Sequence, residues 1–159
     1  MIARYLEDFA VGQTFRSGRL SVEAERIRTF AAEFDPQPFH LDDEAALDGF
    51  FGGLVASGWH TAAVVMRLLV QNYLSIEASL GSPGIDEIRW PYPVRPGDTL
   101  RVRATVLEAR RSLSKPDRGI IKTLVEAVNQ DGRTVMRATA INFLRVRPAP
   151  GALGQHGGE

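Results

Sequence analysis

The 159-residue sequence predicts one α+β domain, in which a long apolar helix packs against an antiparallel sheet. Residues 59–78 are apolar on nearly every side of a helix, a pattern typical of a helix that is buried all round. Four strand-like runs follow, at 84–92, 99–109, 119–129 and 133–147. A block of strands joined by short turns, placed after the helices, favours an antiparallel α+β arrangement.

Turn and capping residues mark where the elements begin and end. Pro-Gly-Asp at 96–98 predicts a turn, and Asn-Gln-Asp-Gly at 129–132 predicts a hairpin between the last two strands. Nearer the N-terminus, residues 9–12 predict a turn and 13–20 a weakly alternating first strand. Ser21 can cap the helix that follows. Apolar residues at helical spacing predict the buried face of that helix: Ile27, Phe30, Ala31 and Phe34.

Composition and charge exclude several classes of protein. The 19 basic and 19 acidic residues balance, so no overall field attracts nucleic acid or an anionic membrane. Cysteine is absent, which excludes disulfides, thiolate chemistry and a cysteine-based metal site. The N-terminus has acidic residues where a signal peptide needs an apolar run, so we expect a cytoplasmic protein. Arg67 and Gln71 interrupt the apolar helix, which is too short to span a membrane.

The length suits a single domain with a full hydrophobic core. We expect that domain to occupy residues 1–147. Residues 148–159 are rich in glycine and proline with little apolar content, which predicts a disordered C-terminal tail.

The segment Asp35-Pro-Gln-Pro-Phe-His40 carries an acid and an imidazole five residues apart. On a helix they would lie about 140° apart, and on a strand they would face opposite sides. Pro36 and Pro38 exclude a helix interior and predict a stiff, irregular loop that could bring both side chains together. An imidazole can take a proton from water near neutral pH, and a carboxylate beside it can orient the ring. An acid before proline is also a common turn-former, and a single histidine is often a packing residue.

Ser57 can cap the long helix, and Gly58 then supplies its first backbone N–H. The N–H groups of a first helical turn have no partner within the helix and lie at the positive end of its dipole. Because glycine has no side chain, a carbonyl oxygen can approach this N–H closely, which would make an oxyanion site. An ordinary helix cap is the commoner outcome for a Ser-Gly pair.

Two further groups of polar residues admit a functional and a structural interpretation. Asp42 and Asp43, together with Asp35 and His40, could form a metal cluster, but helix capping explains the two acids without an ion. We therefore expect no metal. His60, in the first turn of the long helix, could line the site or simply pack against a neighbour.

These motifs resemble the MaoC-like dehydratases, the family of the (R)-specific enoyl-CoA hydratases. The resemblance rests on Asp35-Pro-Gln-Pro-Phe-His40 with the Leu-Asp-Asp-Glu-Ala-Ala that follows, and on Gly53-Leu-Val-Ala-Ser-Gly58. It extends from Phe-Ala-Val-Gly at 9–12 to Arg-Pro-Gly-Asp at 95–98 and the strands beyond, and so covers residues 5–147. It implies a hotdog fold, in which a curved antiparallel sheet wraps a central helix, and a homodimer or an assembly of dimers.

The resemblance also implies an activity. Members of the family add water to 2-enoyl-CoA thioesters or remove it from (R)-3-hydroxyacyl-CoA, a hydro-lyase reaction of fatty acid metabolism. Asp35 and His40 match the family's acid and base, and Gly58 matches its oxyanion donor. The base would deprotonate a water held by both side chains, and the acid partner would return a proton to C2. Coenzyme A enters as part of the substrate, and no other cofactor is implied.

The sequence departs from the family pattern at several positions. Phe34 stands where the family often has glycine, Gln37 where it has asparagine and Phe39 where it has leucine. Some hydratases carry a helix serine where this chain has Met66. The asparagine usually supports the dyad, so Gln37 bears on its geometry. Gln37 is also a weaker candidate for substrate binding, as are Ser57 and Trp59.

Two other functions stay open at this point. A hotdog acyl-CoA thioesterase would use a carboxylate on or near the central helix. Residues 58–76 contain no acid, and Glu77 comes only at the far end. A non-catalytic acyl-thioester-binding subunit stays open because of Phe34 and Gln37. Alternating side chains could line an acyl tunnel or pack in the core: Ile88, Trp90 and Tyr92. Basic residues could contact coenzyme A phosphates or form a solvated face: Arg101, Arg103, Arg110, Arg111, Lys115 and Arg118.

Overall fold

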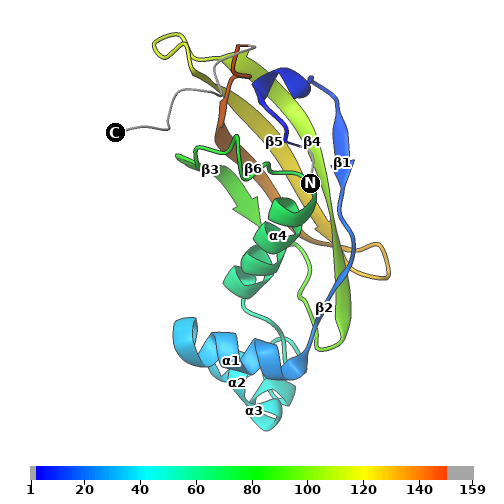
Figure 1. Ribbon diagram of the computed structural model, residues 1–159. Helices are drawn as coiled ribbons and strands as arrows, with labels where there is room; N and C mark the ends of the chain where they lie inside the picture. The colour runs from blue at the N-terminus through cyan, green and yellow to red at the C-terminus, as the bar shows by residue number, and fades with distance from the viewer. Residues whose placement is uncertain (1–2, 150–159) are drawn as a thin grey trace.

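The structure, a computed structural model, describes residues 3–149 and is organised around helix α4 (Gly58–Asn72) (Figure 1). This helix lies against one face of a curved antiparallel sheet. Three shorter helices gather beyond the end of α4 at which that helix begins: α1 (Ala24–Phe34), α2 (Pro38–Leu41) and α3 (Asp43–Leu47). The predicted α+β class, with a central helix and an antiparallel sheet, is confirmed.

Five strands run side by side in the sheet, and each pairs antiparallel with its neighbours. Their order across the sheet is β1 (Thr14–Arg16), β4 (Asp98–Arg111), β5 (Arg118–Val128), β6 (Thr134–Arg145) and β3 (Gly84–Arg89). A short strand, β2 (Leu20–Val22), pairs with the first residues of β4, and a 3-10 turn, η1 (Leu6–Asp8), precedes β1. The predicted hairpin joins β5 to β6, where the Asn129 side chain accepts hydrogen bonds from the turn backbone.

The core lies between α4 and the sheet. Along β5, buried and half-buried residues alternate, so every second side chain faces the helix. On α4 the buried positions repeat at helical spacing and include Val65 and Leu68, which pack with Ile121 and Leu144 of the sheet. Full burial of one such side chain stabilises the fold by about 1.5–3 kcal/mol, so this contact fixes the position of α4 and of its N-terminus.

Helix α4 differs from the prediction in length and in burial. It ends at Asn72 rather than at residue 78 because Tyr73 turns into the core, where its hydroxyl lies 2.6 Å from the Thr123 hydroxyl. Within this chain the helix is not buried all round, since Trp59 and Met66 are 59% and 49% exposed. In residues 3–149, no helix combines the length and the apolar character needed to cross a membrane.

Other expectations are corrected near the N-terminus. The predicted first strand at 13–20 is two short strands, and Ser21 lies in the second of them rather than at a helix cap. Glu23 takes the capping position of α1 without a side-chain hydrogen bond. On α1, Ile27 and Ala31 are buried as predicted, whereas Phe34 is exposed. Of the predicted tail, residues 150–159 lie outside the described part of the chain.

Candidate active site

Asp35 and His40 come together because the segment between them is partly helical. Asp35 follows the last residue of α1, and residues 38–41 form the single turn of α2, so the prediction of an irregular loop is wrong for that half. Pro38 is the first residue of α2, a position where proline loses no hydrogen bond and its fixed φ suits a helix. This turn carries His40 back toward α1, so that its Nε2 lies 3.3 Å from Asp35 Oδ2.

The imidazole of His40 is held in one orientation by the backbone. His40 is buried, and its Nδ1 lies 2.7 Å from the carbonyl oxygen of Val55, just before α4. A carbonyl oxygen only accepts hydrogen bonds, so Nδ1 carries a proton and donates it. In the neutral ring, Nε2 is then the nitrogen with a free lone pair, and it is the nitrogen that faces Asp35.

The carboxylate of Asp35 accepts two hydrogen bonds from neighbouring side chains. Ser57 Oγ donates to Oδ2 at 2.6 Å, and Gln37 Nε2 donates to Oδ1 at 2.7 Å. The hydrogen bond from Ser57, then that from Gln37, hold the pKa of Asp35 below its ordinary value of 3.8, and the charge of His40 adds to this while burial opposes it. Asp35 is therefore a carboxylate at neutral pH. The sequence left open how Gln37 affects the pair, and in the structure its side chain supports the Asp35 carboxylate.

The Ser57 hydroxyl makes two hydrogen bonds, and the sequence predicted only one of them. Its hydroxyl oxygen accepts a 3.2 Å hydrogen bond from the backbone N–H of Trp59, so Ser57 caps α4 as expected. The same hydroxyl donates its proton to Asp35. This second contact spans 22 residues of sequence, and a capping pattern gives no signal of it. Ser57 is fully buried and contributes to the site through Asp35.

Gly58 begins α4, and the indole of Trp90 covers it on one side. A Cβ added to Gly58 would lie 2.7 Å from Trp90 Cε2, closer than real side-chain atoms approach. Trp90 also packs edge-on against Trp59, with ring centroids 5.2 Å apart. The lack of a side chain at Gly58 therefore makes room for the indole, and the predicted role of its N–H as an oxyanion donor stays a prediction. Trp90 is a member of this site that the site motifs alone did not identify.

The connection after β3 holds this half of the chain against the sheet. The backbone N–H of Ala56 donates to the Val94 carbonyl at 2.8 Å. Arg95 Nη2 donates to the Phe51 carbonyl at 2.6 Å. Two residues of one connection thus fix the loop that leads into Ser57 and Gly58.

The remaining acidic candidates have structural roles. Asp42 caps α3 by accepting a 2.8 Å hydrogen bond from the Ala45 N–H, and Asp43 pairs with Arg28 at 2.6 Å. Within residues 3–149, no three histidine or acidic side chains are placed to hold a metal ion. The capping interpretation is confirmed for Asp42, whereas Asp43 is the first residue of α3 and forms an ion pair instead.

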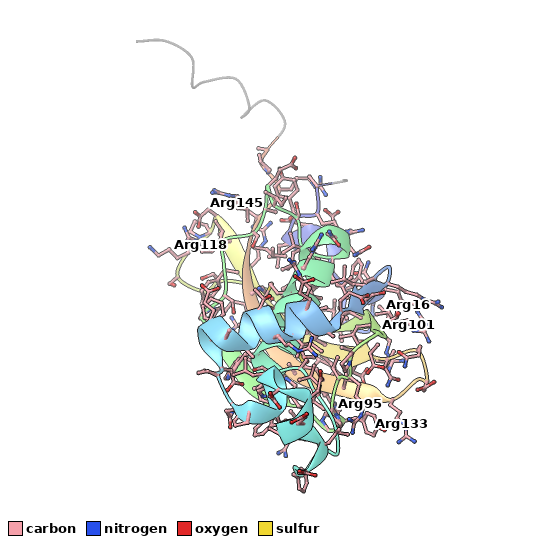
Figure 2. All side chains as sticks on the ribbon, turned by 90° about the horizontal axis from the view of Figure 1, so that it is seen from below. Arg16, Arg95, Arg101, Arg118, Arg133 and Arg145 are labelled. Carbon is pink, nitrogen blue, oxygen red and sulfur yellow. The ribbon has the colours of Figure 1, made fainter. Side chains whose placement is uncertain are left out.

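The basic residues do not form one patch. Arg101 and Arg118 lie at opposite ends of the β4–β5 pair and are well separated in Figure 2. Four of the six predicted members form ion pairs with nearby carboxylates: Arg103, Arg110, Arg111 and Arg118. The three side chains that could line an acyl tunnel have different surroundings. Ile88 packs against the core, and Trp90 lies on Gly58. Tyr92 lies beneath the guanidinium of Arg133.

The sequence matches the model of the MaoC-like domain over residues 8–129. It is 32% identical over 125 residues to the protein YdeM of Bacillus subtilis, covering 79% of this chain and 87% of that protein. It is 38% identical over 97 residues to 3-hydroxyacyl-thioester dehydratase Z of Mycobacterium tuberculosis, a match that covers 60% of this chain and 61% of the relative.

Solved structures agree with the sequence comparisons. The MaoC-like dehydratase from Rhodospirillum rubrum superposes with a TM-score of 0.84 at 50% identity, covering 92% of this chain and all of that one. The (R)-hydratase PhaJ1 of Pseudomonas aeruginosa superposes with a TM-score of 0.67 at 27% identity, covering 91% of each chain. These neighbours, the matched domain model and the central-helix architecture lead to one conclusion: the chain belongs to the MaoC-like dehydratase family and has its hotdog fold.

Proposed function

We propose that this protein adds water to 2-enoyl-CoA thioesters, or removes it from (R)-3-hydroxyacyl-CoA, with Asp35 and His40 as the catalytic pair. One observation carries the proposal. With Nδ1 bound to the Val55 carbonyl, the lone pair of His40 Nε2 faces the Asp35 carboxylate across 3.3 Å. The 3.3 Å gap is too short for a water molecule to lie between the two atoms, but one water beside the pair can donate one O–H group to each acceptor. The hydratase and dehydratase relatives support a water-handling site here.

In the hydration direction His40 acts as the base. Nε2 takes a proton from the water while Asp35 holds its other O–H, and the oxygen attacks C3 of the enoyl group. The electron pair of the C2–C3 double bond moves toward the thioester carbonyl. The imidazolium then returns its proton to C2, so one water is added in total. The lowered pKa of Asp35 favours His40, rather than the acid, as the group that carries the proton.

The thioester carbonyl accepts a hydrogen bond from the Gly58 N–H in this proposal. This N–H is the first of α4 and lies at the positive end of the helix dipole. Negative charge grows on the carbonyl oxygen as water attacks, so the hydrogen bond strengthens most in the transition state. Trp90 and Trp59 border this position and would contact the thioester. The mechanism assigns every step to these groups, with no metal or redox cofactor and with coenzyme A as part of the substrate.

A second copy of the chain is the partner we propose. Large apolar side chains are exposed on α4, at Trp59 and Met66, and on the edge strand β3, at Ile85. An edge strand has unpaired backbone groups that a second β3 can complete. A dimer would cover the apolar side of α4 and close the catalytic site. Multi-angle light scattering of the purified protein tests this, and a monomer at micromolar concentration would contradict it.

The activity is tested by mixing purified protein with crotonyl-CoA. The enoyl thioester absorbs in the ultraviolet, and we expect this absorbance to fall with no release of free thiol. Thiol release from the same mixture would instead identify a thioesterase. Binding of crotonyl-CoA and of longer or branched enoyl-CoAs, with neither signal, would make the chain a non-catalytic acyl-thioester-binding subunit.

A further inference from the structure

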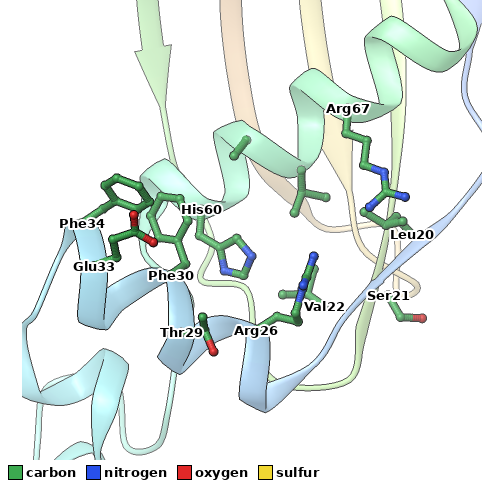
Figure 3. Close-up of a pocket in the computed structure, with 12 residues that line it drawn as sticks. Leu20, Ser21, Val22, Arg26, Thr29, Phe30, Glu33, Phe34, His60 and Arg67 are labelled. Carbon is green, nitrogen blue, oxygen red and sulfur yellow. The ribbon is translucent and has the colours of Figure 1, made fainter.

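A cavity of about 340 Å³ lies between α1, β2 and α4, apart from the catalytic pair (Figure 3). Asp35, His40, Ser57 and Gly58 are absent from its lining. Its apolar surface comes from Phe30 of α1 and from side chains of β2 and α4. The volume falls within the range of small-molecule sites.

Two arginines from opposite sides give one end of this cavity a positive charge. Arg26 extends from α1 toward α4, and Arg67 extends from α4 toward β2 (Figure 3). Within residues 3–149, neither guanidinium is within ion-pair distance of a carboxylate. The carboxylate of Glu33 lies at the other end, beside Phe34. The cavity is therefore polarised, with a cationic end and an acidic end.

His60 adds a buried polar group to the same cavity. Its side chain points from α4 into the cavity and stacks on Phe30, with ring centroids 4.9 Å apart and an angle of 10° between the rings. The residue is only 8% exposed, and its Nδ1 has no hydrogen-bond partner among the described residues. Burial, and then the charge of Arg26, lower the pKa of His60, so the ring is neutral at neutral pH. A buried nitrogen without a partner is uncommon in a folded protein.

We propose that this cavity binds a monocarboxylate with a short hydrocarbon chain. The carboxylate lies between Arg26 and Arg67, whose guanidinium groups match its planar geometry. The hydrocarbon chain lies on Phe30 and Val64, and neutral His60 completes the polar part of the lining. Glu33 at the far end repels a second negative charge, which selects a monoanion over a dicarboxylate. The site is independent of the proposed catalytic reaction, because it uses none of the dyad residues.

Isothermal titration with hexanoate tests the proposal, and hexan-1-ol and inorganic phosphate are the comparison ligands. We expect hexanoate to bind at least about tenfold more tightly than either, because the alcohol lacks the charge and phosphate lacks the hydrocarbon chain. The ring signals of His60 should shift in the NMR spectrum as hexanoate is added. Failure of hexanoate to bind, or equal affinity for hexan-1-ol or phosphate, overturns the proposal.

Matched variants test whether hexanoate binds in this cavity. Arg67→Gln and Arg26→Gln should each weaken hexanoate binding by about tenfold, because each removes one charged hydrogen bond. Arg101→Gln, at an exposed arginine of the sheet, is the control and should bind as the unaltered protein does. Asp35→Asn should also bind normally, which separates this site from the catalytic one. Loss of binding in Asp35→Asn, or equal loss in Arg101→Gln, contradicts the assignment, and circular dichroism confirms that each variant is folded.

Discussion

Ser57 Oγ donates a 2.6 Å hydrogen bond to Asp35 Oδ2, so the residue that caps α4 also holds the carboxylate of the proposed catalytic pair. One hydroxyl group thereby joins the start of the central helix to the end of α1. Gly58, the proposed oxyanion donor, is the next residue along the chain. The distance between the Asp35 carboxylate and the proposed oxyanion site is therefore fixed by two consecutive residues at the start of one helix.

Replacing Ser57 by alanine should raise the pKa of Asp35. The hydrogen bond from Ser57 is the largest cause of the lowered pKa of Asp35, and this cause is absent in Ser57→Ala. In an acid titration followed by NMR, the carboxyl carbon signal of Asp35 should therefore titrate at higher pH than in the unaltered protein. Loss of the cap and of the buried hydrogen bond should lower the free energy of unfolding by about 1–2 kcal/mol. Ser57→Thr, which keeps the hydroxyl, is the control, and an unmoved Asp35 titration in Ser57→Ala would argue against this role.

Removing either member of the proposed catalytic pair should abolish most turnover. Asp35→Asn and His40→Ala should each lower kcat by about 10²–10⁴-fold, the usual contribution of a positioned acid or base. Steady-state rates with crotonyl-CoA measure the loss, and far-ultraviolet circular dichroism checks the fold. A folded Asp35→Asn variant with nearly unchanged activity would refute the assignment of the dyad.

The stability contributed by Asp35 should depend on pH in a defined direction. Its pKa is lower in the folded protein than the ordinary value of 3.8, so the carboxylate stabilises the fold above that value. This contribution is lost as the pH falls below 3.8 and through the folded-state pKa. Urea unfolding of the unaltered protein and of Asp35→Asn should therefore give a difference in unfolding free energy that is constant near neutrality and declines in acid. A difference that grows toward low pH would show that the pKa is raised instead.

A side chain at position 58 should disturb the packing of Trp90. The Cβ of Gly58→Ala would meet the indole at 2.7 Å, and overpacking of this kind costs about 1–3 kcal/mol. Truncating the indole in a Gly58→Ala/Trp90→Ala double variant should recover part of that cost, so the two changes should not be additive. Thermal unfolding of both single variants and the double variant completes the cycle. Strictly additive effects would mean that the clash is not the cause.

The sequence predicted the elements better than it predicted the contacts between them. The strands were found because β5 alternates buried and half-buried residues, a pattern that backbone geometry imposes on any sequence with one buried face. The end of α4 was missed because a hydrogen bond to Thr123, fifty positions away, draws Tyr73 out of the helix. Apolar periodicity contains no information about such a partner.

In the candidate site, too, local features were predictable and contacts between distant segments were not. Asp35 and His40 were recognisable as residue types in a motif, but their spacing alone could not bring them together, because the turn of α2 does so. The capping role of Ser57 was local and was predicted correctly. Its bond to Asp35 and the contact of Trp90 with Gly58 join distant segments, so only the folded chain reveals them.

The contacts of Val94 and Arg95 have a consequence for how this site can change. The groups assigned to water activation and carbonyl binding all lie within residues 35–58, and the connection after β3 fastens the loop within that stretch at Phe51 and Ala56. The stretch proposed to be catalytic is therefore attached to the rest of the fold in part through the backbone carbonyls of Val94 and Phe51, and of these two attachments only the one to Phe51 depends on a side chain, that of Arg95. Substitutions elsewhere in the sheet can therefore accumulate while these attachments are kept, and the residues that line the acyl group can change to suit new substrates.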